Sequence, residues 1–408
     1  MSEMIQVPDG WEVKKVSSLC KILDNQRIPL NDEERQNMKG HIPYYGANAI
    51  VDYIDSYLFD EDLILLAEDG GNFDEYENRP ISFKISGKSW VNNHAHILKP
   101  NKNVEFDYVF YSLEHKNITS YIRGGTRSKL NQSDLRDVDV LIPKEKKEQE
   151  KIANILSTLD KAIESTNRLI EKEKNIKKAL MQELLTNGID KDGHIRTRAT
   201  HTYKESELGM IPEEWEIVSL GEISTKISDG IHATPVYSDS SNFYFINGNN
   251  LENGKIIITE KTNCVDEEEY KKYKLELTEN TILLSINGTI GNIAFYKNEK
   301  VVLGKSAAYI ICKNNIDIYF LSFLLSSHAV LQSFELNLTG STIKNLSIRA
   351  IRETKIIYPS MPEQKQIAKI LTTQDKKIET EETNLAKLKE LKKGVMNDLL
   401  SGKVRVMV

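Results

Sequence analysis

Hydrophobic positions recur with a helical period in two stretches of the chain, 148–185 and 363–400. Steps of three, four and seven residues place them on one seam, while Lys and Glu cover the remaining faces. Each stretch stops at a glycine-containing pair, Asn187-Gly188 or Ser401-Gly402, as expected for a helix C-cap. The pattern predicts two long helices of about 40 residues, each roughly 60 Å long.

The two stretches are copies of one another. At a constant offset of 215, 18 of 38 positions are identical, which indicates a duplication. The similarity continues upstream more weakly, where PDGWEV (8–13) matches PEEWEI (212–217) at a different offset. The chain therefore holds two unequal copies of one unit, a globular domain followed by a long helix.

A helix of this length with one apolar seam needs a partner, and the other copy is the nearest one. We expect an intrachain coiled coil, either parallel or antiparallel. Thr166 and Glu381 interrupt the seam, so part of it is expected to remain available to another protein. The residues expected to pair the helices or to dock a partner are Ile152, Ile155, Leu156, Ile163, Ile170, Leu180, Leu184, Ile367, Ile370, Leu371, Ile378, Leu385 and Leu399.

The globular halves alternate short β-type runs with turn-rich stretches, and helices are expected at 107–120 and 317–336. Each half is therefore predicted to be α/β or α+β with a mixed sheet. The polar stretch between them has no periodicity and predicts a linker. The expected order is a first domain (1–144), a central helix (145–187), a linker (188–211), a second domain (212–360), and a distal helix with a tail (361–408).

Composition and charge narrow the class of protein. A net charge of −6 over 408 residues excludes a histone-like packaging protein, so contacts with nucleic acid would need local basic surfaces. The three cysteines are far apart and predict neither a disulfide framework nor a zinc module. The chain start has no apolar signal region and the apolar runs are short, so we expect a cytoplasmic protein without membrane contact.

Several short motifs resemble those of enzymes, but their spacing does not match that of a catalytic or cofactor site. Gly304-Lys305-Ser306 resembles the end of a phosphate-binding loop, but Glu299 stands where the first glycine should be. A nuclease-like set from Asp9 to Lys14 is crowded into one turn, whereas metal ligands of that kind come from separate strands. His94 and His96 have no third metal-ligand residue nearby, which favours a structural or hydrogen-bonding role. We therefore expect no catalytic residues and no metal in this chain.

Binding residues are expected in two glycine-containing loops and two aromatic stretches. Glycine turns with small hydroxyls and cations suit phosphate oxygens, although a solvated helix cap explains them equally well. The stretches 41–55 and 242–255 offer aromatic and amide groups for base edges, or are ordinary hairpins packing a core. The candidates for DNA contact are Tyr44, Tyr45, Asn48, Arg123, Arg127, Lys129, Asn249, Asn250, Thr339, Ser341, Thr342 and Lys344.

With these features in hand, the chain resembles the specificity subunits of type I restriction-modification systems over nearly its full length. The resemblance depends on the doubled Pro-x-x-Trp-Glu motif (8–12, 212–216), the string PYYGANAIVDYID, and the doubled Glu-Gln-x-x-Ile-Ala-x-Ile-Leu helices. Each motif is weak alone, but their order and duplication are specific.

The resemblance implies two target recognition domains that each read one half of an asymmetric, bipartite, double-stranded DNA sequence. It also implies that the helices pair with pseudo-twofold symmetry, set the spacing of the two domains, and dock two methyltransferase subunits, to which endonuclease subunits can be added. S-adenosylmethionine, ATP and Mg are implied only in those partner subunits.

Other classes of protein remain open at this point. A coiled-coil scaffold that does not bind DNA would explain the helices but not two large domains. A self-sufficient nuclease or methyltransferase would need motifs that are missing here. A specificity subunit of a related system with a fused methyltransferase-nuclease is a closer alternative.

Overall fold

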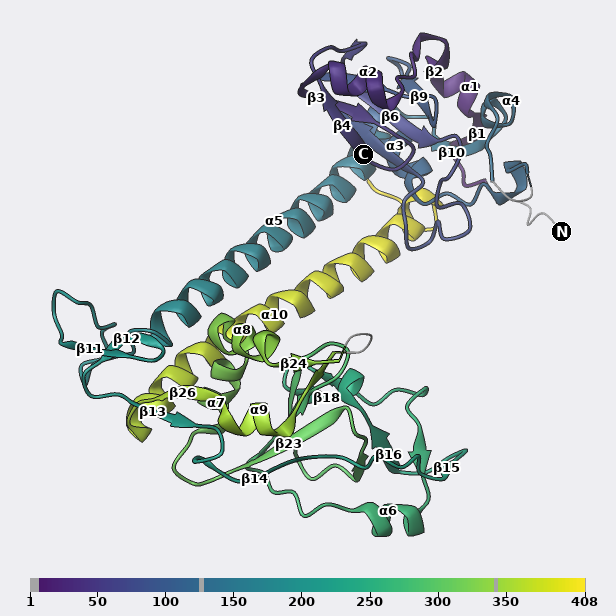
Figure 1. Cartoon of the computed structure of the whole chain (residues 1–408). Helices are drawn as coiled ribbons and strands as arrows, with labels where there is room; N and C mark the ends of the chain where they lie inside the picture. Colours follow the sequence, from purple (N-terminus) through teal and green to yellow (C-terminus); the bar gives the residue numbers. More distant parts are fainter. Residues whose placement is uncertain (1–6, 125–127, 341–343, 408) are drawn as a thin grey trace. The chain divides into compact units, whose positions relative to one another are not determined.

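The computed structural model describes residues 7–124, 128–340 and 344–407. The chain forms two compact units (Figure 1). Unit 1 comprises Met1–Arg168 and Thr383–Val408, and unit 2 comprises Leu169–Glu382. Each unit therefore contains one globular domain together with a segment of each long helix.

Unit 1 contains two four-stranded sheets. The first is antiparallel and has the strand order β2 (Cys20–Ile22), β9 (Ala95–Pro100), β6 (Leu63–Ala67), β7 (Ser82–Ile85). The second is mixed and has the order β4 (Ile50–Ile54), β3 (Lys39–Tyr45), β8 (Lys88–Val91), β5 (Phe59–Asp60). A separate pair joins β1 (Trp11–Lys15) to β10 (Asp139–Pro143). The helices of this domain are α1 (Val16–Leu19), α2 (Asp32–Asn37), α3 (Phe106–Glu114) and α4 (Gln132–Arg136).

Unit 2 repeats this plan with different lengths. Its antiparallel sheet has the order β14 (Ser224–Asp229), β23 (Ala307–Cys312), β20 (Thr281–Ser285), β21 (Ile293–Phe295). Its mixed sheet has the order β15 (Tyr237–Ser238), β19 (Cys264–Val265), β16 (Phe243–Ile246), β22 (Val301–Leu303). Shorter pairs are β13 (Glu216–Ser219) with β26 (Lys355–Tyr358), β17 (Leu251–Glu252) with β18 (Lys255–Ile256), and β24 (Leu338–Thr339) with β25 (Asn345–Leu346). Its helices are α6 (Glu267–Tyr273), α7 (Ile318–Leu325), α8 (His328–Leu336) and α9 (Ile348–Glu353). The predicted mixed-sheet α+β class is confirmed for both domains.

Two predicted helices are shorter than the sequence pattern suggested. The helix expected at 107–120 ends at Glu114, and the Asn117 side chain then accepts a hydrogen bond from the Thr119 amide instead of continuing the helix. The helix expected at 317–336 is two helices, because Ser327 caps α8 by accepting from Val330 N. Short polar side chains compete with helical hydrogen bonds, and here they end the helices.

The stretch expected to be an irregular linker is partly ordered. It contains the hairpin of β11 (Tyr203–Ser206) and β12 (Gly209–Pro212). Upstream of this hairpin, Asp190 accepts hydrogen bonds from the amides of Asp192 and His194. The sequence pattern missed this order because it comes from side-chain caps and turns rather than from hydrophobic periodicity.

The long helices α5 (Lys146–Leu184) and α10 (Met361–Leu400) lie side by side within each unit (Figure 1). In unit 2, Lys177 pairs with Asp375 and Lys174 with Glu382, so the two segments are antiparallel. In unit 1, Lys392 of α10 lies 2.8 Å from Asp160 of α5. The pairing direction, which the sequence left open, is antiparallel.

The apolar seam contributes to the cores of both units. Of the seam residues named from the sequence, Ile163, Leu180, Ile370 and Leu385 are half-buried, and Ile155 is 37% exposed. Thr166, which interrupts the seam, is buried and donates to the Ala162 carbonyl. The remaining seam residues are buried: Ile152, Leu156, Ile170, Leu184, Ile367, Leu371, Ile378 and Leu399.

A buried glutamate at the start of α5 joins three distant segments of unit 1. Glu148 accepts a hydrogen bond from the Trp11 indole nitrogen at 3.3 Å. The same carboxylate accepts from Arg405 Nε at 2.6 Å and from Nη2 at 2.9 Å, and the Arg405 guanidinium lies over the Trp11 ring. A bidentate guanidinium–carboxylate pair of this kind is directional and strong. The tail after α10 is thereby fastened to the first turn of α5.

Unit 2 contains the same joint. Glu363, at the start of α10, accepts from the Trp215 indole at 3.2 Å and from both terminal nitrogens of Arg196. Gly188 lies against this group with φ +65°, and a side chain there would collide with Trp215 and Glu363. The predicted caps are confirmed, because Gly402 also has a left-handed conformation, with φ +70°.

The glutamine that follows each buried glutamate makes a second repeated contact. Gln149 donates to the Pro143 carbonyl and accepts from Glu105 N, which precedes α3. Gln364 donates to the Pro359 carbonyl and accepts from Asp317 N, which precedes α7. The repeated Glu-Gln pair therefore ties each long helix to its globular domain, which gives the sequence duplication a structural reason.

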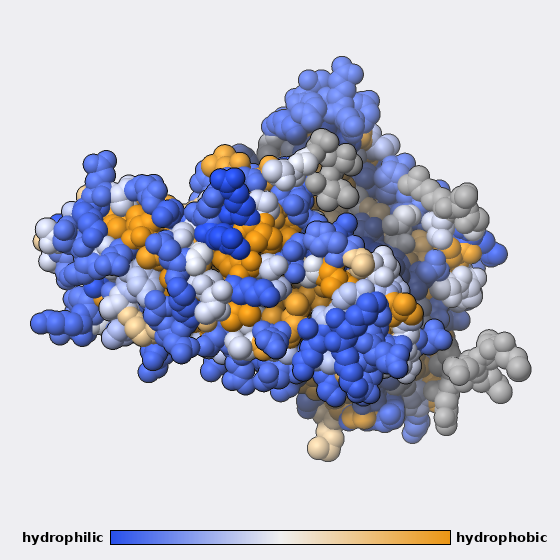
Figure 2. Space-filling model, turned by 60° about the horizontal axis from the view of Figure 1, so that its bottom comes forward, coloured by the Kyte–Doolittle hydropathy of each residue, from blue (hydrophilic) through white to orange (hydrophobic). Residues whose placement is uncertain are grey.

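On the face drawn in Figure 2, hydrophobic residues lie in small groups between hydrophilic ones. Within the described part of the chain, no helix is long and apolar enough to cross a membrane. Cys20, Cys264 and Cys312 are free and buried, so the expected absence of a disulfide framework is confirmed.

We predict that Glu148→Ala lowers the free energy of unfolding by about 2 kcal/mol, because it breaks a charge pair and leaves the buried Trp11 N–H without an acceptor. Chemical denaturation measures this change, and faster tryptic cleavage after Lys403 should accompany it as the tail detaches. Glu150→Ala, an exposed position in the same turn, is the control. Equal stability of the two variants would contradict the role of the joint.

Candidate nucleic-acid interface

The two glycine-containing loops have the same attachments in the two units. Residues 123 and 129 form a bridge in unit 1, and β24 pairs with β25 at the matching positions 339 and 345 in unit 2. Both loops begin with a left-handed glycine, Gly124 or Gly340, each with φ +94°. Both end with a leucine whose amide donates to the residue after a central strand, Glu68 O at 2.8 Å or Ile286 O at 2.9 Å. One backbone framework therefore presents different side chains.

The unit 1 loop presents two exposed cations that are paired with carboxylates. Arg123 Nη2 lies 3.1 Å from Asp134 Oδ1, and the Arg123 side chain is 65% exposed. Hydrogen bonds from Arg123 and Asn131 hold the pKa of Asp134 below its ordinary value. Lys129 Nζ lies 3.1 Å from Glu68 Oε1 and its side chain is 47% exposed. Phosphate oxygens can compete for both cations, because neither is enclosed.

The sequence of the unit 2 loop, 338–346, has a single charged residue, Lys344. Thr339 is exposed and its hydroxyl donates to the Asn345 carbonyl, while Lys344 is exposed. Arg127, Ser341 and Thr342, also expected to contact DNA, lie outside the described residues.

The candidates in the aromatic stretch of unit 1 fall into different environments. Tyr44 is 1% exposed, and its hydroxyl bonds to the backbone of Leu30, so Tyr44 belongs to the core and leaves the set of candidate contacts. Tyr45 is half-buried against Phe83. Asn48 is exposed and donates to the Gly70 carbonyl. The stretch 41–55 forms the β3–β4 hairpin, which agrees with the interpretation of this stretch as an ordinary hairpin.

The two candidate asparagines of unit 2 differ in the hydrogen bonds of their side chains. Asn249 is exposed. Both amide atoms of Asn250 are used, because Oδ1 accepts from Asn247 N and Nδ2 donates to the Ile257 carbonyl. The stretch 242–255 is not one hairpin, because β16 pairs with β19 and β22.

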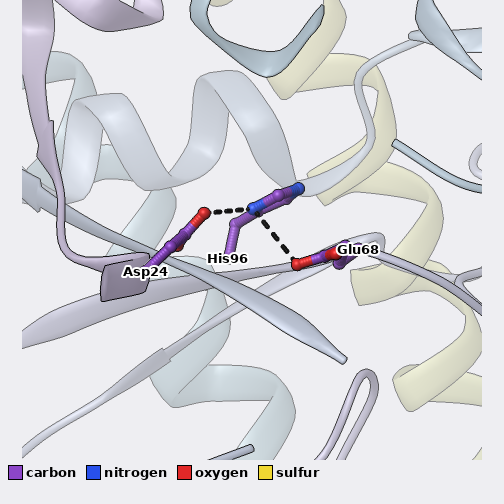
Figure 3. A group of neighbouring side chains, drawn as sticks. All are labelled: Asp24, Glu68 and His96. Carbon is purple, nitrogen blue, oxygen red and sulfur yellow. Dashed lines mark hydrogen bonds and ion pairs between the residues drawn. The ribbon is translucent and has the colours of Figure 1, made fainter. Parts of the chain in front are cut away.

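Next to Leu130, at the end of the unit 1 loop, lies a group of three titratable side chains, the buried Asp24 and His96 and the half-buried Glu68 (Figure 3). His96 Nδ1 lies 2.7 Å from Asp24 Oδ2, and His96 Nε2 lies 2.9 Å from the Leu130 carbonyl. Burial raises the pKa of Asp24, but hydrogen bonds from His96, Gln132 and Ile97 N outweigh burial and leave that pKa below its ordinary value. The predicted hydrogen-bonding role of His96 is confirmed.

The residue types in this group are those of a metal site, but their ligand atoms are already engaged. Arg27 Nη1 donates to Glu68 Oε2 at 2.6 Å, and Lys129 contacts the other oxygen of Glu68. Asp24 accepts from a backbone amide and from Gln132. Cations and amide donors thus balance both carboxylates, so the group is an ion-pair network rather than a cation cage.

Sequence reasoning found His96 but not its partners. Asp24 and His96 are 72 positions apart, and no local pattern connects them. Unit 2 has no equivalent network at the matching register, since β20 places Leu284 opposite Ala308 where β6 places Leu66 opposite His96.

Comparison with known proteins shows the family to which this duplicated chain belongs. The family model described as the type I restriction modification DNA specificity domain matches residues 8–174 and 212–390. The chain therefore belongs to this family and is a type I restriction-modification specificity subunit with two target recognition domains.

Individual relatives span nearly the whole chain. The putative type I restriction enzyme MjaX specificity subunit of Methanocaldococcus jannaschii is 29% identical, covering 99% of this chain and 96% of the relative. The crystal structure of the type I restriction-modification S subunit from M. genitalium has a TM-score of 0.61 at 16% identity, covering 100% of this chain and 99% of that chain. A chain from a structural study of assembly and conformational transition of the type I R-M system has a TM-score of 0.53 at 14% identity, covering 98% of this chain and 100% of that chain. These two structural comparisons show a similarity of fold.

We predict that Asp24→Asn lowers the free energy of unfolding by about 2 kcal/mol near neutral pH, because it removes the charge that His96 faces. Since the folded pKa of Asp24 is depressed, its contribution is full above the unfolded value of about 3.9 and is lost as the pH falls further. The difference between the native chain and the variant should therefore narrow below about pH 4 in denaturation experiments. Asp60→Asn, at an exposed position, is the control. An equally large loss in the free energy of unfolding for Asp60→Asn would contradict the prediction.

Proposed function

We propose that this chain reads an asymmetric, bipartite sequence in double-stranded DNA, with one half-site for each globular domain. One observation carries this proposal: the two loops have equivalent backbone attachments, but Arg123 and Lys129 in one correspond to Thr339 and Asn345 in the other. Equal frameworks with unequal side chains are suited to reading two different sequences.

The charge distribution supports specific rather than general binding. The whole chain carries −6, whereas the loop of unit 1 exposes cations. Local cations that meet phosphates position a protein on DNA, and base-edge contacts then discriminate between sequences. We propose that the chain reads DNA in the cytoplasm.

The long helices are proposed to space the two readers and to dock two methyltransferase subunits, with endonuclease subunits joining some assemblies. The similarity of the two helical copies supports two copies of one partner. Exposed apolar side chains on the helices, among them Ile155, Ile176 and Leu391, offer contact area.

The chain is proposed to be non-catalytic. S-adenosylmethionine, ATP and Mg would then act only in the partner subunits. This proposal is supported by the spacing of the enzyme-like motifs in the sequence, which does not fit a cofactor site, and by the engaged ligand atoms of the Asp24 network.

We predict that exchanging residues 12–143 for the matching domain of another family member changes one half-site and leaves the other intact, since each domain has its own core. Methylation mapping in cells that express the chain with its methyltransferase partner measures the outcome. Exchange of 216–358 is the matched control and should change the other half-site. Loss of both half-sites in a folded, assembled chimera would contradict the modular account.

We predict that Ile155→Glu reduces co-purification of the methyltransferase partner about tenfold or more without changing the DNA sequence that is methylated, because it places a charge in an apolar contact. Ile370→Glu is expected to act in the same direction, but Ile370 also packs against the core of unit 2 and needs a stability check.

Ser165→Glu, at an exposed polar position of α5, adds the same charge outside the seam and serves as the control. Undiminished co-purification with folded Ile155→Glu would show that this part of the helix does not dock the partner.

A further inference from the structure

Resting on the proposed function, we propose that His96 is a positioning residue for the first domain alone. It fixes the loop that carries Arg123 and Lys129, so that reading of one half-site depends on a buried charge network that the second domain lacks.

Both nitrogens of the His96 ring are engaged in hydrogen bonds. A carbonyl oxygen only accepts, so the contact with Leu130 O requires a proton on Nε2. His96 Nδ1 lies 2.7 Å from Asp24 Oδ2, which also accepts from Gln132, and Asp24 Oδ1 accepts from Ile97 N. The ring therefore links the core carboxylate to the end of the loop.

The link acts on the loop because both sides of Leu130 are held. Its amide donates to the Glu68 carbonyl, and its carbonyl accepts from His96. The adjacent Lys129 exchanges both backbone hydrogen bonds with Arg123 at 2.8 Å. A shift at Leu130 would therefore move both exposed cations together.

Charged groups from three segments meet around the ring. Asp24 follows β2, Glu68 follows β6, and Arg27 reaches Glu68 and the Ala95 carbonyl from the segment after Asp24. Lys129 comes from the loop itself. His96 is 0% exposed, so water does not replace a contact that is lost.

Unit 2 holds its loop without this network. Leu346 N donates to the Ile286 carbonyl, as in unit 1, but Ala308 occupies the register position of His96 and has no side-chain donor. A defect at His96 should therefore affect one half-site only.

The test compares His96→Leu, which fills the space without a donor, with His96→Gln, whose amide can still donate to Leu130 O. Each full-length variant is assembled with its methyltransferase partner. Binding is measured to the mapped target duplex and to duplexes with either half-site replaced. The half-site that changes in the 12–143 exchange identifies the one read by unit 1.

We expect His96→Leu to lower the discrimination at the unit 1 half-site about tenfold and to leave discrimination at the other unchanged. His96→Gln should retain more of the discrimination at the unit 1 half-site than His96→Leu does. Leu98→Ala, two positions along β9 and fully buried, is the matched control, because it weakens the core without removing a hydrogen bond to the loop. If His96 had only a structural role, His96→Leu and Leu98→Ala would both lose stability, and neither would change the half-site preference.

Unaltered discrimination, or an equal loss at both half-sites, in folded His96→Leu would overturn this inference while the proposed function stands. Failure of the native complex to prefer its target duplex would overturn the proposed function and this inference with it. If His96→Leu does not fold, Gln132→Leu at a half-buried position removes a donor to Asp24 and should give the same one-sided signature with smaller size.

Discussion

The joint between a buried glutamate, an arginine and a buried tryptophan is the interaction on which the rest of the structure depends. Glu148 with Arg405 and Trp11 forms it in unit 1, and Glu363 with Arg196 and Trp215 forms it in unit 2. In each unit it fastens the segment that follows one long helix to the first turn of the other. A buried carboxylate is tolerated because its oxygens are satisfied by charged and indole donors.

The joint explains how two halves can diverge on one scaffold. The Glu-Gln pair makes the same contacts in both copies and both capping glycines are left-handed, so these sequences remain similar within the chain. The loops attach through backbone hydrogen bonds, which constrain geometry but not side chains. Residues such as Arg123 and Thr339 can therefore differ while the framework is kept. The His96 network shows a further divergence, beneath the surface, in one domain only.

Periodicity predicted the long helices and their caps because these depend on local sequence. It failed where short polar side chains decide the outcome, as at Asn117, Ser327 and Asp190. Among the candidate DNA contacts, Tyr44 looked like a surface aromatic, but its hydroxyl satisfies the Leu30 backbone inside the core. The partners of His96 could not be foreseen, because Asp24 reaches the ring from a distant segment and Gln132, which donates to Asp24, comes from another.

Single-molecule methylation mapping of cells that express the unaltered chain with its methyltransferase partner tests the central claim most directly. Two dissimilar readers on one scaffold predict a methylated motif with two different specified half-sites separated by unspecified bases. A continuous motif, or a palindrome with identical half-sites, would contradict the account.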